Sequence, residues 1–132
     1  MILLDTNICI YIVNAKPLSV LARFQRYRMG DIGLCSVVAA ELAVGVAKSA
    51  SIRNRQALEM FLAPLAVPPF DTAAVWAYGE LRAELERRGT PIGSLDTLIA
   101  AHALSQQATL VTNNTREFSK VPSLRLEDWV NG

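Results

Sequence analysis

Short apolar runs alternate with longer stretches of helical periodicity along the chain. A short apolar run bounded by polar or turn residues is typical of a buried strand, and apolar residues spaced three and four apart predict a helix. The expected strands are Ile2–Leu4, Ile32–Leu34, Leu65–Val67, Thr109–Val111 and Leu124–Leu126. The expected helices are Ile8–Val13, Leu18–Arg28, Val37–Lys48, Arg53–Phe61, Thr72–Arg88 and Leu95–Gln106. This alternation predicts an α/β domain with a mostly parallel central sheet of about five strands, covered by helices on both faces.

The first expected strand stops abruptly at a carboxylate. Met1 to Leu4 are all apolar, and Asp5 follows at once. Ligands of open parallel sheets bind just outside the carboxyl ends of the strands. Asp5 is therefore predicted to lie at the functional rim of the sheet.

Two more acids fall on apolar faces of expected helices. Residues three and four apart share a helix face. The neighbours of Glu41 on its face are Val37, Val38, Val44 and Gly45, and those of Asp96 are Ile99, Ala100 and Ala103. Burying a charge is costly unless another group compensates it. One divalent cation shared by Asp5, Glu41 and Asp96 is the simplest compensator.

The fourth expected strand ends in a polar cluster that runs from Thr112 to Glu117. Asn and Thr are common turn residues, so this cluster alone favours a turn. Neighbouring parallel strands, however, end at the same edge of the sheet. Together with Asp5, the cluster is therefore predicted to be part of a site.

Composition adds mainly exclusions. The 132 residues are 52% apolar and carry a formal charge of +1, so they predict one domain, 1–132, and net charge indicates no particular partner. No apolar stretch approaches the ~20 residues of a membrane span, and Asp5 interrupts any signal peptide, so the cytoplasm is the expected location. Cys9 and Cys35 are too few for a zinc site and are expected to be buried, reduced thiols.

Four motifs in register resemble the PIN-domain ribonucleases, and among them the VapC toxins of bacterial toxin–antitoxin pairs. They are Leu4-Asp5-Thr6-Asn7, Ala40-Glu41-Leu42 with Gly45, the stretch Asp96–Ala103, and Val111-Thr112-Asn113-Asn114 with Phe118. The resemblance covers nearly the whole chain. The tail around Glu127-Asp128-Trp129 also resembles the branch that cuts initiator tRNA.

This resemblance implies a three-layer α/β/α domain and an endoribonuclease that depends on Mg²⁺ or Mn²⁺ and leaves a 5′-phosphate and a 3′-hydroxyl. It implies RNA, specifically tRNA, as substrate, a VapB-type antitoxin as inhibitor, a homodimer, and no membrane partner. The metal-binding and catalytic acids would be Asp5, Glu41 and Asp96, and either Glu41 or Asp96 would orient the attacking water.

The resemblance also implies supporting residues. Many family members carry a further acid at the position of Asn114, so Asn114 is a weaker metal ligand here and Glu117 is expected to contribute through a water molecule. The residues expected to position ligands or phosphate are Thr6, Asn7 and Thr112.

Other readings of the same residues stay open. A catalytically inactive PIN-like module that binds RNA or protein would explain Asn114, and a small phosphatase would use Asp5 as a nucleophile. His102 is the only histidine, which excludes a histidine-pair nuclease and favours a structural role for that residue. The aromatic residues near Trp76 are expected in the core, and two arginine groups, 23–28 and 82–88, are either helix-end charges or phosphate contacts. Apolar residues in 18–22 and 57–62 form either ordinary core or an exposed groove. The family resemblance implies that such a groove receives an amphipathic segment of the antitoxin.

Overall fold

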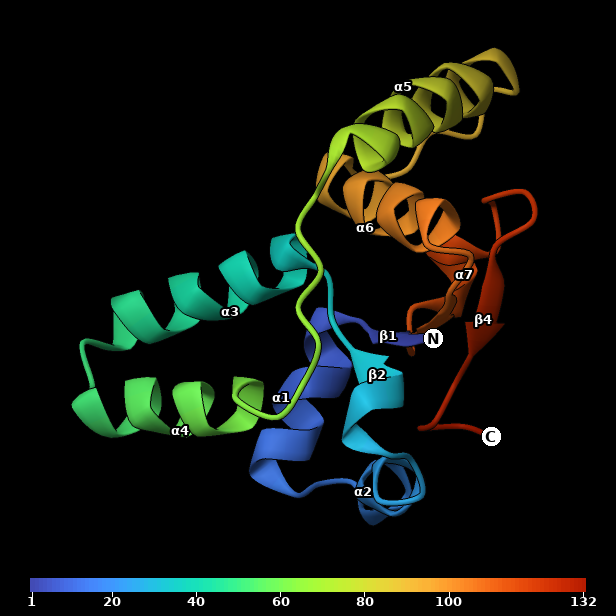
Figure 1. Cartoon of the computed structure of the whole chain (residues 1–132). Coiled ribbons are helices and arrows are strands. Elements are labelled where there is room, and N and C mark those ends of the chain that lie inside the picture. The colour runs from blue at the N-terminus through green and yellow to red at the C-terminus, as the bar shows by residue number, and fades with distance from the viewer.

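The computed structural model describes all 132 residues. The strands are β1 (Ile2–Leu4), β2 (Ile32–Gly33), β3 (Thr109–Val111) and β4 (Arg125–Glu127). The helices are α1 (Thr6–Asn14), α2 (Leu18–Phe24), α3 (Ser36–Ser49), α4 (Ile52–Leu62), α5 (Thr72–Arg87), α6 (Ser94–Ser105) and α7 (Thr115–Phe118), with a 3₁₀ turn at Met29–Asp31 (Figure 1). None of these helices has both the length and the apolar character needed to cross a lipid bilayer.

The sheet is fully parallel with the strand order β2-β1-β3-β4. The first strand of the chain is therefore an inner strand, and its carboxyl end lies beside the carboxyl ends of β2 and β3. Since residue 5 follows β1 and residue 112 follows β3, this register brings both to one edge of the sheet.

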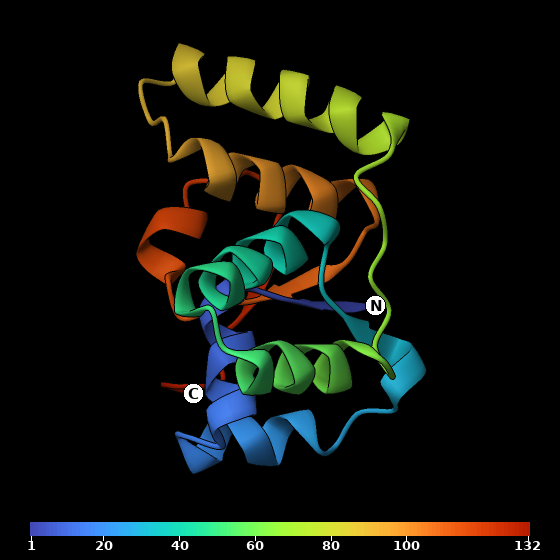
Figure 2. The same cartoon turned by 90° about the vertical axis from the view of Figure 1, so that its left-hand side faces the viewer.

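Helices cover the sheet on two sides. Helices α5 and α6 lie on one side, α1 and α2 lie on the other, and the α3–α4 hairpin projects from one end (Figures 1 and 2). Fully buried side chains of the inner strands and of flanking helices form the shared core; among them are Leu3, Leu110, Ile8 and Ile99. The predicted three-layer α/β/α architecture is confirmed.

The predicted fifth strand is wrong in extent. Within Leu65–Val67 only Ala66 forms a bridge, with Gly33, and its carbonyl accepts a hydrogen bond from Leu34. Pro68 and Pro69 follow immediately. Proline has no amide hydrogen to donate, so the ladder cannot continue past this point.

One predicted helix boundary and one predicted core residue need correction. Helix α2 ends at Phe24 instead of Arg28, and a turn at Gln25 and Arg26 follows it. Trp76 is not in the core, because 69% of its surface is exposed. Helix α5 packs through Ala74, Leu81 and Leu85. Trp76 lies two positions from Ala74, about 200° around the helix, and so faces away from that contact.

The single histidine and both cysteines have the predicted structural environments. His102 is fully buried on α6, and its ring lies edge-on to Phe70 with the ring centroids 5.4 Å apart. Neither ring nitrogen has a hydrogen-bond partner, and burial lowers the pKa of His102. Cys9 and Cys35 are buried free thiols, and burial raises the pKa of each.

Candidate metal centre at the carboxyl edge of the sheet

Asp5 combines the end of a strand with the start of a helix. Its backbone N–H donates to Val111 O at 2.9 Å, which continues the β1–β3 pairing, and its Oδ1 accepts from the Thr6 amide at 2.8 Å as the N-cap of α1. Its second oxygen, Oδ2, accepts from the Thr112 hydroxyl at 2.7 Å. Only 7% of the residue is exposed. Each oxygen therefore has a fixed direction, which is what a ligand in a preorganised site requires.

Thr112 was predicted to position ligands of the site, and its side chain is the hydrogen-bond partner of Asp5. It is fully buried. Its hydroxyl donates to Asp5 and accepts from the Asn114 amide at 3.0 Å, and its own amide donates to the carbonyl of Glu127 at 3.0 Å. The polar end of β3 is thus joined to β1 on one side and to β4 on the other.

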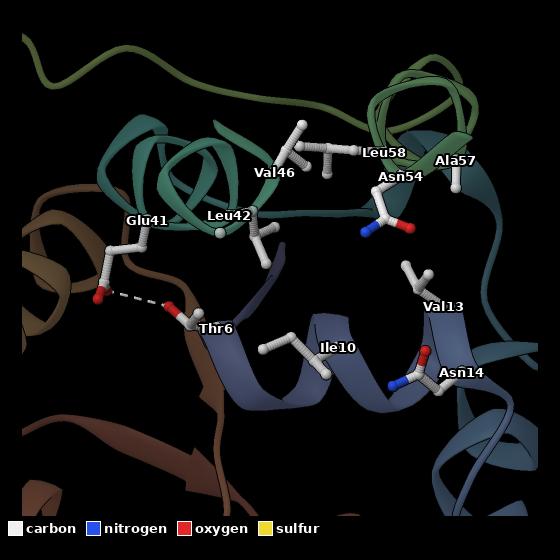
Figure 3. A pocket seen from close by; sticks show the side chains of 11 residues that line it. Thr6, Ile10, Val13, Asn14, Glu41, Leu42, Val46, Asn54, Ala57 and Leu58 are labelled. Carbon is white, nitrogen blue, oxygen red and sulfur yellow. Dashed lines mark hydrogen bonds between the residues drawn. The ribbon is translucent and has the colours of Figure 1, made fainter. Parts of the chain in front are cut away.

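Glu41 reaches the same region from α3. It is half-buried, and its Oε1 accepts a hydrogen bond from the Thr6 hydroxyl at 3.1 Å (Figure 3). Thr6 therefore touches both acids, Asp5 through its amide and Glu41 through its hydroxyl. The prediction that Thr6 positions a candidate ligand agrees with this contact.

Asp96 lies in the first turn of α6 and makes no side-chain hydrogen bond. Burial and then the negative charges of Asp5, Glu117 and Glu41 raise its pKa. Burial also raises the pKa of Asp5, although the Thr112 and Thr6 hydrogen bonds oppose the effect. Asp96 on α6 therefore lies close enough to Asp5, Glu41 and Glu117 to feel their negative charges.

No lysine or arginine forms an ion pair with the three principal acids, whereas Glu117 pairs with Lys120 at 3.6 Å. The side chains do not form a closed cage either, since no three histidine, cysteine, aspartate or glutamate groups come together as a ready metal site. Oxygen donors that are spread around an open edge suit a hard cation that keeps several of its waters. The donor set of Asp5, Glu41 and Asp96 therefore fits Mg²⁺ or Mn²⁺ better than a softer metal.

The remaining predicted residues surround this edge. Asn114 is exposed and contributes its backbone amide to Thr112, with no hydrogen bond from its side chain. Asn7 is exposed on the first turn of α1. Glu117 lies on α7, a four-residue helix that the sequence pattern did not predict.

An apolar groove begins at Glu41. It has a volume of about 270 Å³ and lies between α1, α3 and α4 (Figure 3). Of the residues predicted for it, Ala57 and Leu58 line it, whereas Phe61, Leu62 and those of 18–22 do not. Ile10 and Val13 of α1 line the groove instead. The spacing of apolar residues predicted that both lie on a helix, but it did not predict which face of that helix is exposed.

Most of the predicted arginine groups serve ion pairs. Arg82 pairs with Glu86, and both Arg87 and Arg88 pair with Glu84, all on α5 or at its C-cap. Arg23 pairs with Glu127 at 3.2 Å. Glu127 itself was not predicted, although an acid at the end of β4 repeats the strand-end signal that identified Asp5.

The acidic edge of a parallel α/β sheet defines the class of protein. A family model described as the PIN domain matches residues 2–124 of the chain. Ribonuclease VapC2 of Rickettsia felis is 44% identical over 129 residues, which cover 96% of each chain. The tRNA(fMet)-specific endonuclease VapC of Shigella flexneri is 45% identical over 128 residues, again 96% of each chain.

A solved structure extends the likeness to three dimensions. The crystal structure of VapBC2 from Rickettsia felis bound to a promoter DNA fragment matches with a TM-score of 0.88 and 43% identity, over 98% of this chain and 99% of that one. The chain therefore belongs to the PIN-domain family and, within it, to the VapC ribonucleases. PIN-domain nucleases of this group depend on a divalent cation.

Proposed function

We propose that this ribonuclease is a Mg²⁺-dependent endoribonuclease toxin whose cation is held by Asp5, Glu41 and Asp96. The observation that carries the proposal is the group of acids at one sheet edge, where Asp5, Glu41 and Asp96 form no ion pair with any lysine or arginine. Burial raises the pKa of Asp96, and the negative charges of the neighbouring acids raise it further. An arrangement of acids that costs stability in this way favours a functional role.

We infer a different role for each acid from the number of its carboxylate oxygens that accept hydrogen bonds. Asp5 is fixed at both oxygens and binds the cation in a constant direction. Glu41 is held at one oxygen by Thr6, so its other oxygen is free to act. When bound, Mg²⁺ neutralises charge on the phosphodiester and makes a water molecule more acidic.

Asp96 is suited to the attacking water, since neither of its oxygens is engaged in a hydrogen bond. One oxygen can therefore face the cation while the other orients the attacking water and accepts its proton. We therefore propose that Asp96, besides holding the cation, orients the attacking water, and that Glu41 binds the cation alone.

We assign tRNA as the substrate class and include initiator tRNA. The relative from Shigella flexneri bears the name of a tRNA(fMet)-specific endonuclease and matches 96% of this chain. Asn7 and Arg116, exposed on α1 and α7 beside the acids, are available to contact phosphates.

We assign a VapB-type antitoxin as the partner, with an amphipathic segment in the groove between α1, α3 and α4. The VapC of the matching structure is in a VapBC complex. Six of the eleven residues that line the groove are hydrophobic, and the acid Glu41 is also part of the lining, so a segment with an apolar stripe and one basic residue would complement it.

The test is cleavage of total tRNA by the antitoxin-free protein with Mg²⁺ or Mn²⁺. We expect discrete products from the wild type, none in EDTA, and none from Asp5→Ala or Asp96→Asn. Asp31→Asn is the matched control, because Asp31 is an exposed acid in the 3₁₀ turn and should leave cleavage intact.

Two outcomes would count against the proposal. A folded wild type that binds no Mn²⁺ and cleaves no RNA would favour the inactive binding module and make Asn114 the first residue to examine. A covalent phospho-aspartate on Asp5 would instead favour a phosphatase.

A further inference from the structure

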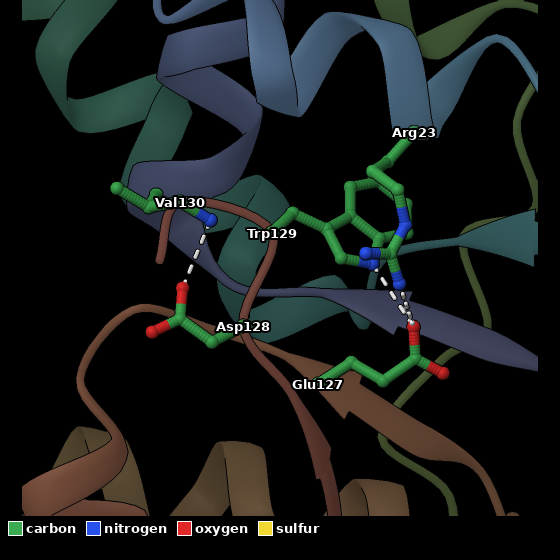
Figure 4. Close-up of polar contacts among 5 residues, drawn as sticks. All are labelled: Arg23, Glu127, Asp128, Trp129 and Val130. Atoms are coloured by element: carbon green, nitrogen blue, oxygen red, sulfur yellow. Dashed lines mark hydrogen bonds and ion pairs between the residues drawn. The ribbon is translucent and has the colours of Figure 1, made fainter. Parts of the chain in front are cut away.

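A cluster of side chains fixes the end of β4. The Oε1 atom of Glu127 accepts two hydrogen bonds, from the Arg23 guanidinium at 3.2 Å and from Trp129 Nε1 at 3.0 Å (Figure 4). Arg23 lies 5.8 Å from the centroid of the Trp129 ring, and Tyr27 stacks on that ring at 5.5 Å. We call Arg23, Glu127 and Trp129 the C-terminal clasp, because they join α2 to the end of the chain.

The C-terminal clasp stabilises β4, which has few other contacts within the sheet. Strand β4 has three residues and pairs only with β3, so it is an edge strand. Short elements at the margin of a fold open more readily than the core. Trp129, in contrast, is almost fully buried and anchors the segment just beyond β4.

A single hydrogen bond joins β4 to Thr112, the residue that contacts Asp5. The carbonyl of Glu127 accepts from the Thr112 amide at 3.0 Å, and the Thr112 hydroxyl donates to Asp5 Oδ2 at 2.7 Å. A continuous chain of contacts therefore runs from the Arg23–Glu127 ion pair through β4 and Thr112 to the carboxylate of Asp5.

The charge of Glu127 distinguishes it from the other acids of this edge. Asp5, Glu41 and Asp96 have no basic partner, whereas Glu127 is paired with Arg23 and bonded to Trp129 through the same oxygen. A carboxylate neutralised in this way is a poor cation ligand, and its position suits a support.

The geometry points to Glu127 and Trp129 as positioning residues that hold Thr112, and through Thr112 the Asp5 carboxylate, in the direction required for cation binding. The inference rests on the proposed function, because it assigns Asp5 to the cation. Residues that orient metal ligands typically change metal affinity by about 10–100-fold when they are removed. Glu127 and Trp129 act one contact further out, so we expect about a 3–10-fold effect.

The experiment measures Mn²⁺ binding by calorimetry for the antitoxin-free wild type, Glu127→Gln and Trp129→Phe. Both variants keep the main chain and most of the packing but weaken the clasp. We expect the Kd for Mn²⁺ to rise about 3–10-fold in each, and the amide hydrogen of Thr112 to exchange faster in the absence of metal. Cleavage should recover at saturating Mn²⁺, because the defect lies in cation binding.

Glu84→Gln is the matched control. Glu84 on α5 has nearly the same side-chain exposure as Glu127, 32% against 34%, and its carboxylate pairs only with Arg87 and Arg88, the latter at 2.8 Å. It should lose stability without any change in the Mn²⁺ Kd or in Thr112 exchange.

The outcomes separate the two claims. If the wild type binds no Mn²⁺, the proposed function fails and this inference fails with it. If the wild type binds and folded Trp129→Phe binds equally well, only the inference is overturned. Weaker binding with unchanged Thr112 exchange would also overturn it, since the effect would not pass through β4.

Discussion

Thr112→Val tests the support of the acidic edge most directly. Valine has nearly the same shape as threonine but replaces the hydroxyl with a methyl group. The hydroxyl makes two hydrogen bonds in a fully buried position, to Asp5 Oδ2 at 2.7 Å and from the Asn114 amide at 3.0 Å. A hydrogen bond to a charged group contributes about 1.5–3 kcal/mol and a neutral one about 1 kcal/mol. We therefore expect the free energy of unfolding to fall by about 2–4 kcal/mol.

The substitution should also change the titration of Asp5. Burial raises the pKa of Asp5 above 3.8, and the Thr112 hydrogen bond opposes that rise. Without the hydroxyl the pKa rises further, so protons compete with the cation up to a higher pH. Mn²⁺ affinity at pH 7 should fall about 10–100-fold, and the loss should be larger at pH 6 than at pH 8.

Calorimetric titration of Mn²⁺ at pH 6 and 8, with urea unfolding at pH 7, measures both effects. Thr112→Ser keeps the hydroxyl and should bind Mn²⁺ like the wild type despite a less well packed core. Thr97→Val is a second control, because Thr97 is also buried and its hydroxyl donates only to Gly93 O at 2.8 Å. Wild-type Mn²⁺ affinity and pH dependence in a folded Thr112→Val protein would refute the reasoning.

Three further predictions concern stability. Asp96→Asn should raise the free energy of unfolding at pH 7 and low salt by only about 0.5–1 kcal/mol, because solvent screens this partly exposed carboxylate. The raised pKa of Asp96 means that its ionisation costs stability as the pH rises above 3.8, and an amide does not ionise. A lower melting temperature of the variant would contradict this. The wild type should lose stability as pH falls below 6.5, since the unfolded chain protonates His102 more readily than the folded chain does, and His102→Leu should remove that component when urea unfolding at pH 7.5 and 5.5 is compared. Gly33→Ala should cost about 2–3 kcal/mol in thermal unfolding, because a Cβ at Gly33 would lie 2.1 Å from Ala66 O, whereas Gly79→Ala, with open space around it, should be neutral or stabilising.

The hydrophobic pattern predicted most of the fold because most elements follow a simple period. The strand Ile2–Leu4 and the helices that carry Glu41 and Asp96 were all indicated by apolar spacing. The pattern failed where tertiary contacts decide. The stretch Leu65–Val67 has the composition of a strand but joins the sheet only at Ala66, and α7 is too short to show a period.

The sequence predicted a list of acids for the candidate site but not the contacts between them. Strand ends and apolar helix faces indicated Asp5, Glu41 and Asp96. Spacing within one element cannot show that the Thr112 hydroxyl reaches Asp5, or that Glu127 holds the strand beside it. Those contacts depend on the register between β1, β3 and β4, which are far apart in the sequence.

The strand order has a consequence for how the enzyme is made. A ribosome synthesises β1 first, yet the partner strand β3 and the hydroxyl that holds Asp5 come 107 residues later. A nascent chain that stops short of Thr112 has the first acid but not its support. The acidic edge can therefore take its observed form only after β3 and Thr112 have been synthesised, because β1 alone lacks both its neighbour in the sheet and the hydroxyl that contacts Asp5.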